Sequence, residues 1–79
     1  MQAYNDAKKR LSDGVKRGRS KVGLSQEALA LQAGINRSYV GQIERGVGNP
    51  SLQVIVKLAN TLQLDVAELF KRDKDERRR

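Results

Sequence analysis

The chain of 79 residues contains no cysteine and no histidine. It therefore lacks disulfides, thiolate chemistry, the commonest zinc ligands and the usual general base at neutral pH. No acid–base or nucleophile pair stands at a useful spacing, and the pairs Asp6/Asp13 and Asp73/Asp75 are typical of solvated charges. We therefore expect no enzymatic activity, no small-molecule substrate, no metal and no cofactor.

Long apolar runs are missing as well. Met1 leads directly into polar residues, and no stretch has the length of a signal peptide or a membrane span. We expect a cytoplasmic protein without a membrane partner.

Aromatic residues make up only 4% of the chain, so leucine, valine, isoleucine and alanine must build the core. This composition favours one small all-α domain over a β-sandwich.

Positive charge is what the chain has in excess, with a formal net charge of +7 and a pI near 10.3. Residues 1–45 carry nine Lys/Arg against four Asp/Glu, whereas residues 46–70 carry one against two. So basic a small domain implies an anionic partner, namely nucleic acid, an acidic protein or a membrane surface. We therefore expect the first half of the chain to bind the anionic partner through its charge, and the second half to make apolar contacts.

Helical spacing and capping residues predict a compact five-helix domain over residues 1–70. The charged tail, residues 71–79, has no apolar face to bury, and we expect it to be disordered. Gly14 and Gly18 each weaken the first helix by about 1 kcal/mol relative to alanine, so its stability must come from packing. The expected helices cover residues 5–22, 26–33, 36–44, 52–62 and 65–70.

Apolar stripes mark the helix faces that we expect to be buried. On the first helix the stripe contains Tyr4, Ala7, Leu11, Val15 and Val22. On the fourth helix it contains Leu52, Ile55, Leu58, Ala59 and Leu62.

The segment 25–45 has the spacing of a helix-turn-helix, with two short helices joined at a tight turn. Gly34 fits the turn, Ile35 is the buried residue after it, and Ala30 is small enough for the helices to cross closely. Val40 and Ile43 form the inner side of the second helix. Its outer face is then left with Arg37, Ser38, Gly41 and Gln42.

These outer residues form an edge suited to reading bases. Arginine matches guanine O6/N7 and glutamine matches adenine N6/N7, while serine and glycine let the backbone approach closely. Alternatively, the same residues are only the solvated face of an ordinary helix. The turn, the caps and the charge asymmetry favour the reading helix.

Several spaced motifs over about residues 11–70 resemble the Cro/phage-repressor (XRE) helix-turn-helix family. They are Gly23-Leu24-Ser25-Gln26-Glu27, Ala33-Gly34-Ile35, Ile43-Glu44-Arg45-Gly46, Asn49-Pro50-Ser51 and Leu69-Phe70. The length and the run Arg37-Ser38-Tyr39-Val40 are similar to the restriction-modification controller proteins of that family. Leu31 and Val54 depart from the pattern, because charged or polar residues are more usual there.

The resemblance implies a role for each matching position. Base reading falls to Arg37, Ser38 and Gln42. Arg19 and Glu44 would form a partly buried ion pair that ties the first helix to the third. Contacts to the DNA backbone, or to backbone and bases, fall to Gln26, Asn36, Tyr39, Arg45 and Asn49, with Lys21 and Arg17 extending the phosphate track. For Tyr39, a half-buried ring that covers the turn is an equally good interpretation.

Val54 and Val56 widen the apolar stripe of the fourth helix beyond what one small core requires. Together with Val66 and Phe70 they are assigned to a homodimer contact, since the centres of interfaces are depleted of charge. The alternative is a merely broad buried face.

The favoured function is a transcriptional regulator that binds a near-palindromic operator on double-stranded DNA as a homodimer. An antitoxin-type protein-interaction module that binds DNA secondarily remains open as an alternative. A nonspecific RNA-binding or membrane-surface protein is disfavoured, because the chain lacks an aromatic stacking platform and an aromatic-rich amphipathic face.

Overall fold

The computed structural model describes residues 2–72, and within that range all regular structure is helical. The all-α prediction is therefore confirmed. The part of the expected tail from residue 73 onward lies outside the described residues. No helix between residues 2 and 72 combines the length and the apolar character needed to cross a membrane. The helices are α1 (Gln2–Val22), α2 (Gln26–Ala33), α3 (Arg37–Glu44), α4 (Leu52–Leu62) and α5 (Val66–Leu69).

Side-chain caps fix where three of these helices begin. The hydroxyl of Ser25 accepts a hydrogen bond from the Ala28 N–H at 3.0 Å, and that of Ser51 accepts one from the Val54 N–H at 3.2 Å. At the start of α3 the side-chain oxygen of Asn36 accepts from the Ser38 N–H at 2.7 Å. Each cap satisfies a backbone donor that has no partner within its helix. The predicted boundaries of α2, α3 and α4 rest on these contacts.

The first helix is longer than expected, since it begins at Gln2 instead of residue 5. Ion pairs one turn apart support its first half: Arg10 pairs with Asp6 at 3.0 Å, and Lys9 with Asp13 at 3.2 Å. The expectation that the apolar stripe is buried along its whole length is wrong at both ends, where Tyr4 and Val22 are exposed. The stripe follows the helical period there, but no other helix covers it.

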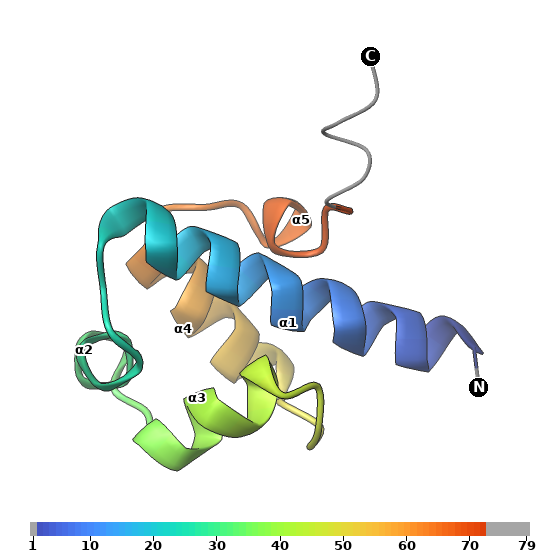
Figure 1. Cartoon of the computed structure of the whole chain (residues 1–79), viewed down its shortest axis with the longest axis horizontal. Helices are drawn as coiled ribbons and strands as arrows, with labels where there is room; N and C mark the ends of the chain where they lie inside the picture. The colour runs from blue at the N-terminus through green and yellow to red at the C-terminus, as the bar shows by residue number, and fades with distance from the viewer. Residues whose placement is uncertain (1, 73–79) are drawn as a thin grey trace.

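The core lies where α1 crosses the other helices (Figure 1). One side of α1 packs against α3 and the opposite side against α5, while α2 packs against both α3 and α4. Leu52, expected in the core, is instead 71% exposed at the start of α4, because it lies on a part of that helix which the rest of the described chain leaves uncovered. The buried apolar residues are Leu11, Val15, Leu29, Ala30, Ala33, Val40, Ile43, Leu58, Ala59, Leu62 and Leu69.

The two glycines of α1 allow its close packing. A Cβ atom at Gly14 would overlap the backbone carbonyl oxygen of Leu69 in α5. A Cβ at Gly18 would lie 3.1 Å from a methyl group of Leu62 and 3.2 Å from one of Leu64. The packing expected to compensate for the low helix propensity is, at Gly14, a direct approach of α5 to the α1 backbone, and at Gly18, contact with the side chains of Leu62 and Leu64.

Candidate nucleic-acid interface

The turn between α2 and α3 is built around Gly34, which has a left-handed backbone with φ +73°. The Ile35 N–H then donates to the Ala30 carbonyl at 3.0 Å, which closes the end of α2. Ile35 itself is half-buried against the core instead of fully buried. Beyond the turn, Val40 and Ile43 are buried, and they anchor the inner side of α3.

The outer edge of α3 carries the three predicted base-reading side chains. Arg37, Ser38 and Gln42 are all exposed, as an outward-facing edge requires. Gly41, which was expected on the same edge, is instead buried. The guanidinium of Arg45 covers it, because a Cβ built at Gly41 would lie 3.3 Å from an Arg45 nitrogen. The missing side chain of Gly41 therefore makes room for the Arg45 guanidinium, and it does not leave the α3 backbone open to DNA bases.

A chain of hydrogen bonds connects this edge to α1. Arg19 donates to both carboxylate oxygens of Glu44, from Nε at 2.7 Å and from Nη2 at 2.9 Å. The amide nitrogen of Gln26 donates to the same carboxylate at 3.0 Å. The amide oxygen of Gln26 in turn accepts from Arg37 at 3.4 Å. Gln26, expected to touch DNA, thus also orients Arg37 from the protein side.

The Arg19–Glu44 pair is charged in the folded state. The Glu44 side chain is only 5% exposed, and burial by itself would raise its pKa. The hydrogen bonds from Arg19 and Gln26, with the positive charges of Arg19 and Lys16, outweigh burial and lower the pKa of Glu44 below its ordinary value. The hydrogen bond to Glu44 also raises the pKa of Arg19. The pair therefore fixes α3 against α1 as a hydrogen-bonded pair of ions.

The residues expected to hold the DNA backbone occupy different surroundings. Asn36 is exposed, but its side-chain oxygen is engaged in capping α3. Tyr39 is half-buried and packs against the core. Arg45 and Asn49 are exposed after α3, and Lys21 is exposed near the end of α1.

Arg17 lies away from the other candidate backbone contacts. Its guanidinium donates to the carbonyl oxygens of Glu68 at 3.2 Å and Lys71 at 3.4 Å. These acceptors belong to α5 and the residues after it, on the side of α1 opposite to α3 (Figure 1). The structure thus gives Arg17 a role in docking α5.

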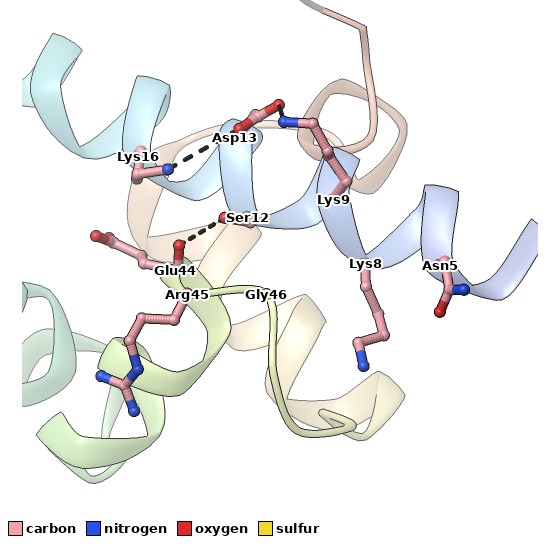
Figure 2. A pocket seen from close by; sticks show the side chains of 9 residues that line it. All are labelled: Asn5, Lys8, Lys9, Ser12, Asp13, Lys16, Glu44, Arg45 and Gly46. Atoms are coloured by element: carbon pink, nitrogen blue, oxygen red, sulfur yellow. Dashed lines mark hydrogen bonds and ion pairs between the residues drawn. The ribbon is translucent and has the colours of Figure 1, made fainter.

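A basic hollow between α1 and the end of α3 was missed by the sequence reasoning (Figure 2). It has a volume of about 380 Å³, and Lys8, Lys16 and Arg45 are among its lining residues. At its centre the Ser12 hydroxyl donates to the Glu44 carbonyl at 2.7 Å. The positions 8, 12 and 16 share one face of a helix, so their spacing was a signal, but the sequence did not show that α3 lies against that face.

The residues assigned to a dimer contact are only partly exposed. Val54, Val66 and Phe70 are half-buried against the core, whereas Val56 is 39% exposed. The most exposed apolar side chain on α4 is Leu52, one turn before Val56. The uncovered apolar surface of α4 is therefore formed by Leu52 and Val56.

Comparison with known proteins identifies relatives of the same architecture. Residues 15–69 match the family model HTH_3, described as helix-turn-helix. The control protein C.SmaI of Serratia marcescens is 36% identical over 69 residues, which cover 87% of this chain and 82% of that protein. The transcriptional regulator SlrR of Bacillus subtilis is 43% identical over 53 residues, covering 66% of this chain but only 35% of SlrR.

A solved structure shows the same fold. The restriction-modification controller protein C.AhdI from Aeromonas hydrophila superimposes with a TM-score of 0.76 at 44% identity. The match covers 80% of this chain and 96% of C.AhdI.

Proposed function

Since this chain belongs to the helix-turn-helix (HTH_3) family of DNA-binding transcriptional regulators, we propose that it is a sequence-specific regulator that binds a near-palindromic operator as a homodimer. In this proposal α3 enters the major groove, as the second helix of such motifs does. The similarity to C.SmaI and C.AhdI supports a role related to that of the restriction-modification controller proteins.

The observation that carries the proposal is the two-sided character of α3. Its inner side is anchored by the buried Val40 and Ile43, while Arg37 and Gln42, five positions apart, are exposed on the outer side. An arginine can donate two hydrogen bonds to guanine, and a glutamine can pair with adenine. Arg37 is also pre-oriented by Gln26, which lowers the entropy lost when it binds a base.

The remaining cations supply affinity independent of sequence. Arg45 and Lys21 are exposed and extend the positive surface around α3. Contacts of this kind fix the position of a protein on the duplex but do not read bases. Asn49, in the loop after α3, is a further candidate for a phosphate contact.

Dimerisation through α4 would place two copies of α3 in successive major grooves, about 34 Å apart. Leu52 and Val56 are the uncovered apolar side chains of that helix. Val54, Val66 and Phe70 are half-buried against the core, and in this proposal a second copy buries them further. The low charge of residues 46–70 suits the centre of such an interface.

Selection of bound duplexes from a random pool tests the function directly. Arg37→Ala should cost about 1–3 kcal/mol on the selected site and relax the preference at one base pair. Arg45→Ala should instead weaken binding to all duplexes alike and reduce the salt slope by about one. Equal losses for Arg37→Ala on selected and random DNA would contradict its role in base reading.

A second experiment tests the dimer. Leu52→Asp and Val56→Asp should shift the protein to monomer in analytical ultracentrifugation at micromolar concentration, because each places a charge in an apolar contact. Leu31→Asp is the matched control, since Leu31 is 82% exposed but lies on α2. A wild-type protein that sediments only as a monomer would remove the dimer from the proposal.

A further inference from the structure

Lys8 lies against the loop that follows α3, although it is far from that loop in the sequence. It lines the basic hollow together with Arg45 and Gly46, and also a small crevice formed with Val47 and Pro50. Lys8 is half-buried, in contrast to Lys9 and Lys16, which are exposed. Its aliphatic stem therefore packs beside the loop, while the ammonium group reaches the surface.

The charge of Lys8 is not neutralised by a carboxylate in the part of the chain that the structure describes. The acidic residues that line the hollow are Asp13 and Glu44. Asp13 pairs with Lys9 at 3.2 Å and with Lys16 at 4.0 Å, and Glu44 pairs with Arg19 at 2.7 Å. Lys16 also contributes to the low pKa of Glu44. The ammonium of Lys8 instead lies 4.9 Å from the centre of the Tyr4 ring. In Figure 2 its side chain extends away from Asp13, on the side of α1 that faces α3.

The loop beside Lys8 offers further donors. The N–H of Gly46 donates to the carbonyl of Ile43, and the N–H of Val47 donates to the carbonyl of Gln42. The N–H groups of Gly48 and Asn49 donate to no protein acceptor between residues 2 and 72. Gly48 has φ +81°, and successive N–H groups next to a left-handed residue can form concave sites for anions.

We propose that Lys8 holds a phosphate of the DNA backbone, next to the phosphate contacts made by Arg45 and the loop after α3. The first half of α1 thereby lengthens the phosphate track beyond the segment bound by α2 and α3. This inference rests on the proposed function, because it requires that α3 and its loop face DNA. The Tyr4 ring keeps the Lys8 side chain at the surface, where the ammonium exchanges this cation–π contact for the phosphate.

A purely structural role for Lys8 predicts a different result. A surface cation–π pair contributes about 0.5–1 kcal/mol, so removing the charge would alter stability slightly and leave the dependence of DNA binding on salt unchanged. A phosphate contact predicts the reverse, because each neutralised phosphate of duplex DNA releases counterions and adds about 0.9 to the slope of log K against log salt.

The test is to measure that slope by fluorescence anisotropy on a duplex of random sequence, for the wild type and for Lys8→Gln. We expect the slope to fall in magnitude by about 0.9 for Lys8→Gln and to return to the wild-type value for Lys8→Arg. Lys71→Gln is the matched control, because it removes the same charge after α5, on the opposite side of α1. Thermal unfolding confirms that each variant is folded.

The outcomes separate this inference from the function on which it rests. If the wild type binds DNA and Arg45→Ala lowers the slope, but Lys8→Gln behaves as the wild type or as Lys71→Gln, the Lys8 contact is refuted and the regulator proposal stands. If the wild type binds no duplex, both the Lys8 contact and the regulator proposal are refuted. A titration with inorganic phosphate, followed by NMR, provides a third comparison. If phosphate shifts the amide signals of Lys8 and Gly48 while Lys8→Gln leaves the salt dependence of DNA binding unchanged, the hollow binds a free anion. That result would overturn the proposed DNA contact.

Discussion

Replacing Gly14 with alanine should destabilise this domain, although Gly14 lies in the middle of a helix. In an exposed helix the same substitution stabilises by about 1 kcal/mol, because alanine loses less backbone entropy. At Gly14 the new Cβ would overlap the carbonyl oxygen of Leu69 and lie 2.7 Å from its carbonyl carbon. These are backbone atoms, which cannot rotate away as a side chain can, so α5 must move.

The size of the effect follows from what α5 buries. Leu69 is completely buried, and exposing a leucine side chain costs about 1.5–3 kcal/mol. Strain from the added methyl group costs about 1–3 kcal/mol more if α5 moves only in part. After the gain of about 1 kcal/mol in helix propensity is subtracted, we expect a net loss of about 1.5–5 kcal/mol. A domain of this length has a total stability of only about 4–12 kcal/mol.

Gly18→Ala is the matched control in the same helix. The contacts of its Cβ, at 3.1 and 3.2 Å, would be with methyl groups at the flexible ends of Leu62 and Leu64. These groups can shift by a few tenths of an ångström, so we expect Gly18→Ala to stay within about 1 kcal/mol of the wild type.

Urea unfolding followed by circular dichroism measures both variants. In thermal unfolding, a loss of about 1.5–5 kcal/mol for Gly14→Ala corresponds to a fall in Tm of roughly 6–40 °C for a domain of this size. If Gly14→Ala proves as stable as the wild type or more stable, the packing of α5 on the α1 backbone is wrong. Equal destabilisation by both substitutions would point to a general effect on α1 instead of the Leu69 contact.

Two further predictions concern the framework of α3. The folded-state pKa of Glu44 is below its ordinary value, so the stability it contributes is present above the pKa of the unfolded chain and is lost as pH falls toward the folded pKa. Urea titrations between pH 7 and pH 3 should show this loss in the wild type and a smaller one in Glu44→Gln; parallel pH profiles would exclude the lowered pKa. Asn36→Ala should cost about 1 kcal/mol through loss of the cap on Ser38 N–H, whereas Asn36→Ser should retain most of it. Equal unfolding midpoints for the two Asn36 variants would show that the cap contributes nothing.

Local features of the sequence were enough to predict the helix-turn-helix. Ser25 and Asn36 cap the two helices through contacts with residues two or three positions ahead, and Gly34 adopts the left-handed conformation between them. The 3.6-residue period then places Arg37 and Gln42 on the exposed edge once Val40 and Ile43 are assigned inward. The Arg19–Glu44 pair was inferred from the family resemblance, since nothing local connects two residues on different helices.

The tertiary structure decided how the helices cover one another. Periodicity shows which residues share a helix face, but not which faces meet another element, and that depends on the path of the whole chain. For this reason Leu52 was misassigned to the core, and Arg17 is found at α5. Only the packing of α1 between α3 and α5 explains why Gly14 must lack a side chain and why Lys8 lies beside the loop after α3. Both depend on contacts between residues distant in sequence, whose geometry no short-range pattern encodes.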